Sequence, residues 1–111
     1  MRSTCRASSP SRAIGWGLAG ALVLPGVAPA ETHVIAIEGM QFQPATVTVK
    51  RGDKVVWRNK DIVPHTATAA GKFDSRDIAV NRSWSWTAKA AGRFDYVCTY
   101  HPTMKGALVV Q

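Results

Sequence analysis

Short apolar runs that alternate between hydrophobic and polar positions make up most of the chain after about residue 30. The alternation is clearest in Thr46–Val49 and in Ser83–Thr87, where every second side chain is apolar. No stretch keeps a helical period for three turns. Strict alternation over a short run is typical of a β-strand with one buried face. The pattern therefore predicts an all-β domain.

Seven strands are expected, joined by turns rich in Gly, Ala and Asp. They are predicted at residues 33–38, 46–50, 55–58, 65–69, 83–87, 93–98 and 107–110. Many short strands with frequent turn signals are typical of two sheets packed face to face. We expect Trp57, Trp84 and Trp86 to fill the core, because large aromatic side chains carry much of the buried area in a small domain.

The first thirty residues have a different composition and predict a secretory signal. Three arginines flank or precede an apolar run at residues 13–24, and an Ala-Pro-Ala cleavage pattern ends at Ala30. The apolar run is shorter than the roughly 20 residues that a membrane span needs. We therefore expect residues 1–30 to be a cleaved signal peptide. Residues 31–111 would then form one exported domain without a membrane span, located in the periplasm.

Removal of the leader leaves a single cysteine, Cys98. A structural cysteine in an oxidising compartment normally has a disulfide partner, so the Cys98 sulfur is either inert or bound to something else. The remaining chain has eleven basic and seven acidic residues, a net charge of +4. The basic residues are scattered through the turns, which argues against nucleic acid as a partner. We expect the mild positive field to steer an acidic partner protein.

The segment Cys98–Met104 carries the candidate chemistry. It places a thiolate, an imidazole and a thioether at three-residue steps, and His65 lies thirty-three residues upstream. Two imidazoles and a thiolate in a plane, with a weak axial thioether, form a type 1 copper site, which transfers electrons. Each residue alone is more often structural, but their joint spacing favours a metal. We expect His65, Cys98, His101 and Met104 to bind one copper ion.

A second copper site is a further hypothesis, at the new N-terminus. If cleavage follows Ala30, His33 is third from a free amine, and the amine, two backbone amides and the imidazole can surround Cu(II) in a square. We favour the alternative, a strand histidine with a solvated ring, because the site depends wholly on an inferred cleavage point.

The chain from about residue 35 to 110 resembles the cupredoxins, the blue copper proteins, and within them the amicyanin group. The resemblance rests on Met40-x-Phe42-x-Pro44, Val-x-x-Gly-Asp-x-Val-x-Trp ending at Trp57, Pro64-His65, Gly92-Arg93-Phe94-Asp95-Tyr96, and Cys98-x-x-His101-Pro102-x-Met104-x-Gly106. It implies a Greek-key β-sandwich of about seven or eight strands. It also implies copper ligands at His65, Cys98, His101 and Met104, and a role in soluble electron transfer.

The departures from the amicyanin pattern lie next to the expected ligands. Tyr100 stands where that group has Pro, so it has a backbone N–H that is able to donate to the Cys98 thiolate. Thr66 stands where the group has Asn after the first histidine. We expect a monomer that meets redox protein partners at its His101 face. Prolines 64 and 102 and Met40 would form an apolar surface there, rimmed by lysines 60, 72 and 105.

Two other classes of protein are weighed. A periplasmic copper carrier or storage protein is one alternative, but carriers use open Met-rich or His-rich sites, and a buried thiolate site favours retention over release. An immunoglobulin-like binding module is a remote alternative, because Tyr96 precedes Cys98 by two residues, yet that fold would need a second cysteine. An enzyme is not expected, since the four ligands leave no second metal site and no evident substrate pocket.

Overall fold

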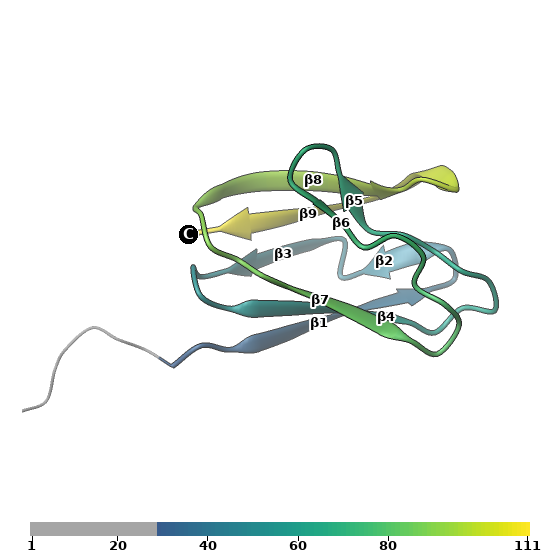
Figure 1. The fold of residues 1–111 in the computed structure, drawn as a ribbon, viewed down its shortest axis with the longest axis horizontal. Helices are drawn as coiled ribbons and strands as arrows, with labels where there is room; N and C mark the ends of the chain where they lie inside the picture. Colours follow the sequence, from purple (N-terminus) through teal and green to yellow (C-terminus); the bar gives the residue numbers. More distant parts are fainter. Residues whose placement is uncertain (1–28) are drawn as a thin grey trace, which may run out of the picture.

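A computed structural model describes residues 29–111 as two β-sheets packed face to face (Figure 1). Residues 1–28, most of the expected signal peptide, lie outside the described residues. The strands are β1 Thr32–Glu38, β2 Gln41–Gln43, β3 Thr46–Val49, β4 Lys54–Asn59, β5 Thr68–Ala69, β6 Phe73–Asp74, β7 Ser83–Thr87, β8 Gly92–Cys98 and β9 His101–Val110. The prediction of an all-β sandwich is confirmed.

The two sheets contain both parallel and antiparallel neighbours. One sheet has the strand order β2-β1-β4-β7, and the other has the order β3-β9-β8-β5-β6. β1 pairs with β4 in parallel, and β3 pairs with β9 in parallel, whereas β8 and β9 form an antiparallel pair. The described residues hold nine strands rather than seven or eight, because β2 and β6, with three and two residues, were not predicted.

The core lies between the sheets and is centred on Trp57. Ile35 and Ile37 of β1 are fully buried while the neighbouring Val34 is 57% exposed, so the predicted alternation places one face of the strand in the core. The Trp57 ring lies 5.4 Å from that of Tyr96 in an edge-on arrangement, which is favourable for aromatic pairs. Trp57 lies in the core as expected. Trp84 and Trp86 are only half-buried and pack against the core cluster.

Gly106 in β9 makes room for the ring of Tyr96. A methyl group at Gly106 would overlap Cζ and the hydroxyl oxygen of Tyr96 and would lie 2.8 Å from Cε2. Tyr96 is 1% exposed and is wedged between Phe42 and Trp57, at ring distances of 4.7 and 5.4 Å. These two neighbours restrict the movement of the ring.

A tight turn before β4 buries the carboxylate of Asp53, which is 4% exposed. Gly52 in this turn has a φ of 96°, a conformation that favours glycine. Asp53 accepts hydrogen bonds from the backbone N–H of Glu31 at 3.0 Å and of Lys50 at 2.9 Å, and contacts Nε2 of His33 at 2.9 Å. These bonds, the backbone ones first, lower the pKa of Asp53 to about 2.

Asp53 should make the fold acid-sensitive in a defined pH range. Its pKa is about 2 in the folded chain against an ordinary value of 3.8, so its ionised form favours folding. That stabilisation is complete above about pH 5 and is lost as the pH falls towards about 2. We expect Asp53→Asn to flatten this part of the stability profile, measured by urea unfolding at stepped pH. Asp95→Asn, at a 73% exposed side chain, is the control and should leave the slope unchanged.

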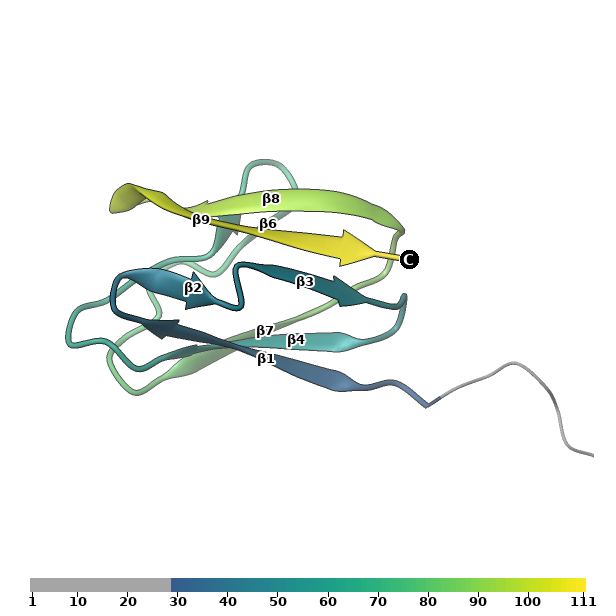
Figure 2. The same ribbon diagram turned by 180° about the vertical axis from the view of Figure 1, so that it is seen from behind.

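Different parts of the chain lie at the two ends of the sandwich. The turn between β8 and β9 lies at one end, while the C-terminus and the approach of the chain to β1 lie at the other (Figure 2). Among the described residues, no helix is both long enough and apolar enough to cross a membrane.

Candidate metal centre

The expected ligands come from three segments that meet at the β8–β9 end of the sandwich. Cys98 is the last residue of β8, His101 is the first residue of β9, and Met104 lies within β9. His65 lies in the segment between β4 and β5 and forms an isolated bridge with Ile78. The backbone N–H of His65 donates to the carbonyl of Ile78 at 3.2 Å, and the carbonyl of His65 accepts from the N–H of Ile78 at 2.7 Å. These two bonds fix the position of the His65 backbone.

The ligand segment after Cys98 is a tight turn at residues 99–100 followed by the irregular start of β9, a strand that was expected only at residues 107–110. Cys98 pairs with His101, whereas the residue before Cys98 pairs with Lys105. Residues 102–104 therefore have no opposite residue on β8 and form a bulge. Pro102 is compatible with this irregular part of the strand because it has no N–H to give to a regular ladder.

Three donor atoms converge at this end. Sγ of Cys98 lies 3.6 Å from Nδ1 of His65 and 4.0 Å from Nδ1 of His101, and all three atoms lie within 4.8 Å of one another. Metal bonds of about 2.0 Å to nitrogen and 2.3 Å to sulfur together reach about 4.3 Å, so one ion is able to touch the sulfur and each nitrogen. A thiolate with two imidazoles suits copper in both oxidation states.

Burial differs among the expected ligands. His65 and Cys98 are fully buried, and His101 is half-buried. Met104 is 4% exposed and belongs to the hydrophobic core, so its side chain lies in the interior rather than at the surface. Its assignment as the axial ligand stays a prediction.

Asp61 orients His65 and was missed by sequence reasoning. Its Oδ2 lies 2.8 Å from Nε2 of His65. Because a carboxylate only accepts, Nε2 carries the proton and Nδ1 presents a lone pair to the site. Asp61 also accepts from the backbone N–H of Gly39 and Met40. Burial opposes ionisation, but these bonds outweigh it and lower the pKa of Asp61. An acid four residues before the histidine is the sequence signal.

Thr66 ties the two ligand segments together. Its backbone N–H donates to Sγ of Cys98 at 3.4 Å, and its hydroxyl accepts from the backbone N–H of Thr99 at 2.9 Å. The Thr66 N–H occupies the role considered for the N–H of Tyr100, that of a donor to the thiolate. Such a bond withdraws charge from the sulfur and favours the reduced metal.

Tyr100 contributes its side chain to the centre's outer support. Its hydroxyl donates to Oδ1 of Asp77, and this bond raises the pKa of Tyr100. Asp77 is next to Ile78, the bridge partner of His65. The turn that carries His101 is thus linked through side chains to the segment that positions His65.

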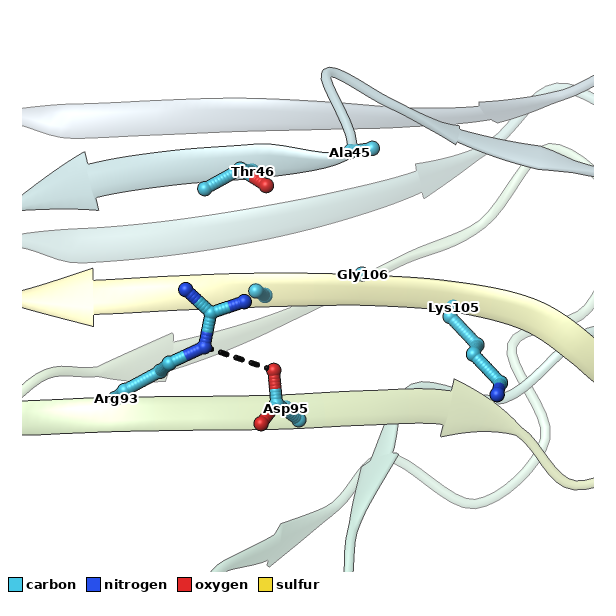
Figure 3. A pocket seen from close by; sticks show the side chains of 7 residues that line it. Ala45, Thr46, Arg93, Asp95, Lys105 and Gly106 are labelled. Carbon is cyan, nitrogen blue, oxygen red and sulfur yellow. Dashed lines mark hydrogen bonds and ion pairs between the residues drawn. The ribbon is translucent and has the colours of Figure 1, made fainter.

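A pocket along β3, β8 and β9 has none of the three converging donors among its lining residues (Figure 3). Its lining residues are Ala45, Thr46, Arg93, Asp95, Lys105, Gly106 and Ala107. Arg93 and Asp95 pair with each other at 3.1 Å and are 60% and 73% exposed. This pocket offers solvated charges rather than a buried reactive group.

Comparison with known proteins places the chain among related sequences. The family model for a cupredoxin-like domain matches residues 13–110. The amicyanin-alpha of Methylorubrum extorquens is 36% identical over 99 residues, covering 84% of this chain and 83% of that protein. The chloroplastic plastocyanin of Tetradesmus obliquus is 35% identical over 129 residues, covering 99% and 89% of the two chains.

Solved structures give the same relationship in three dimensions. An amicyanin variant in its Cu(I) form superimposes with a TM-score of 0.68 at 33% identity, covering 77% of this chain and 86% of that one. A second amicyanin variant, in the oxidised state, gives a TM-score of 0.68 at 32% identity, with 72% and 82% coverage.

Proposed function

This chain belongs to the cupredoxin-like family, as a copper protein that carries electrons rather than an enzyme, and we propose that His65, Cys98, His101 and Met104 bind its copper ion. The convergence of the Cys98 sulfur with two imidazole nitrogens, at 3.6 and 4.0 Å, carries this proposal. When bound, copper supplies a Cu(II)/Cu(I) couple that takes up and releases one electron.

The surrounding residues hold the donor atoms in one arrangement. Asp61 fixes the ring of His65, and the Thr66–Thr99 contacts hold the Cys98 segment against it. Burial excludes water from Sγ, while the Thr66 N–H offsets part of its charge. Donors that are organised before the electron arrives need little rearrangement, which lowers the barrier to transfer.

We propose that redox partners dock on the surface around His101, the half-buried ligand. Four exposed apolar side chains support this choice: Met40, Ile62, Val63 and Tyr100 are 40, 90, 37 and 52% exposed. Met40 is bonded through its N–H to Asp61, Ile62 and Val63 follow Asp61, and Tyr100 precedes His101. An exposed apolar surface with few specific bonds suits brief encounters. We call these four residues, with Pro64 and Pro102, the apolar docking face.

We propose that Lys60 and Lys105 flank this face and that Lys72 lies away from it. Lys60 precedes Asp61, and Lys105 follows Met104. Lys72, expected at the same rim, instead lines a pocket with Trp86 and Gly92 at the start of β8. That pocket is at the opposite end of β8 from Cys98, so Lys72 serves as a distant control.

Reversal of the flanking charges should slow reduction by an anion. We expect the double variant Lys60→Glu, Lys105→Glu to be reduced about tenfold more slowly by ferrocyanide at low salt, measured by stopped-flow absorbance. The effect should nearly vanish at about 1 M salt, where the screening length is about 3 Å. Lys72→Glu should have a much smaller effect. Equal rates for the double variant and the parent at low salt would contradict charge steering.

The function itself is tested by titrating the purified chain with Cu(II). We expect one copper per chain, an intense visible absorption from the thiolate, and a reversible one-electron wave in voltammetry. A weakly coloured complex, or copper that yields no reversible wave, would contradict the proposed site.

We further infer that the carrier acts in the periplasm as a monomer after cleavage following Ala30. The leader composition supports that location.

A further inference from the structure

The start of β1 is held by Asp53 at the end of the sandwich opposite the metal centre. Oδ1 of Asp53 lies 3.0 Å from the backbone nitrogen of Glu31, and Oδ2 accepts from the backbone of Lys50 and contacts His33. We propose that Asp53 is a binding site for the α-ammonium group of Glu31, which cleavage after Ala30 creates. This inference rests on the proposed export and cleavage of residues 1–30.

Charge balance is the first argument. Asp53 is buried and ionised, and among the described residues its one ion-pair partner is His33, which is charged only when protonated. Buried carboxylates are normally paired with a cation. In the uncleaved chain the Glu31 nitrogen is a neutral amide, whereas a free α-amino group has a pKa of about 7.7–8.0 and is cationic at neutral pH. Cleavage therefore delivers a positive charge to the atom that already faces Asp53.

Strand register is the second argument. Glu31 directly precedes β1 and Asp53 directly precedes β4, and the two strands pair in parallel from Thr32 opposite Lys54. The N–H of Lys54 also donates to the carbonyl of Glu31 at 2.9 Å. Parallel strands have no hairpin turn to set their register, and a one-residue slip would turn the buried face of β1 to solvent. An ion pair between Glu31 and Asp53 fixes both strand starts together.

The same geometry argues against copper at the new N-terminus. A square site would need the amine, the amides of Thr32 and His33, and the His33 ring around one ion. In an extended strand successive backbone N–H groups point to opposite sides, so the two amides cannot face one ion while β1 is formed. The His33 ring is also engaged with Asp53 at 2.9 Å. The carboxylate, rather than a metal, fits this position.

The test compares chains that differ only at the Glu31 nitrogen. One chain begins at Glu31 with a free amine, and the other keeps residues 28–30, so that Glu31 has a peptide bond. Every strand in the part of the chain that the structure describes lies between Thr32 and Val110, so both chains contain the whole sandwich. At pH 7 we expect the free-amine chain to unfold at a midpoint a few degrees higher. In the Asp53→Asn background this difference should disappear.

Acetylation of the Glu31 amine provides a second comparison that needs no folded Asp53 variant. It removes the charge and should lower the midpoint to that of the extended chain. Equal midpoints for the acetylated and free-amine chains would overturn the proposal, as would a difference that persists in Asp53→Asn. Mass spectrometry of the exported protein should give Glu31 as its first residue, and a different first residue would also overturn it. Copper absorption should be the same in all forms. Failure of the proposed ion pair between Asp53 and the Glu31 amine is therefore distinguishable from failure of the metal site.

Discussion

Replacement of Cys98 by serine should abolish the intense visible absorption of the copper-loaded protein. The absorption arises from charge transfer between a thiolate and Cu(II), and a serine hydroxyl cannot supply it. Cys98 is fully buried, and its sulfur lies within 4.0 Å of both imidazole nitrogens. Because the site is buried, a group from the protein surface cannot take the place of this sulfur. Copper affinity should fall by more than the roughly 10–100-fold that outer-shell substitutions cost, measured by competition with a chelator.

Met104→Leu is the matched variant, because it replaces a thioether in the same buried region by an apolar side chain of similar volume. It should keep the absorption and raise the reduction potential, since a weak axial donor stabilises Cu(II). Unfolding of each metal-free variant in urea separates ligand loss from misfolding. An intense thiolate band in Cys98→Ser would refute the ligand assignment. An unchanged potential in Met104→Leu would mean that Met104 serves only in core packing.

Gly106→Ala should destabilise the fold by about 3 kcal/mol, at the upper end of the usual cost of overpacking. The added methyl group would overlap the ring and hydroxyl of Tyr96, which is held between Phe42 and Trp57. Neither a rigid ring nor the backbone of β9 is able to yield without disturbing the core. Urea unfolding of the metal-free protein measures the loss.

Lys105→Ala is the control for this effect, since it changes an exposed neighbour in the same strand and should cost less than about 0.5 kcal/mol. A Tyr96→Leu background should remove much of the penalty of Gly106→Ala, because the ring that the methyl group meets is gone and the two changes are not additive. A loss below about 1 kcal/mol for Gly106→Ala alone would show that the core accommodates the methyl group, contrary to the close approach seen at β9.

Alternation predicted most of the longer strands, but it predicted only the last four residues of β9, which has ten, and it failed for the short ones. β1, β4 and β8 lie within one residue of their expected bounds, because each has enough residues for a period of two to be visible. β2 and β6 are too short for any period. The strand expected at residues 65–69 is reduced to Thr68–Ala69, because His65 is held by a single bridge and turns its ring to Cys98.

The site was predicted as a set of residue types and not as a set of contacts. Spacing alone indicated that His65, Cys98 and His101 would converge, and the structure brings them together. Spacing gave no account of Asp61 or of the Thr66 hydroxyl, because their hydrogen bonds depend on how two segments far apart in the chain lie in space. The sequence pattern also placed the start of the last strand at residue 107, whereas β9 begins at His101, because the pairing of Cys98 with His101 depends on register.

Chain entropy orders the steps by which the metal centre assembles. Cys98 and His101 are three residues apart, so the turn that joins them closes at little entropic cost, whereas His65 is 33 residues from Cys98. The parallel pairing of β3 with β9 brings Val47 to Leu108 and closes a still longer loop. Folds with such distant pairings form in milliseconds to seconds rather than microseconds. Before the sheets have paired, the local turn holds Cys98 and His101 close together without His65, so the rate of folding sets the time at which the His65 imidazole joins them.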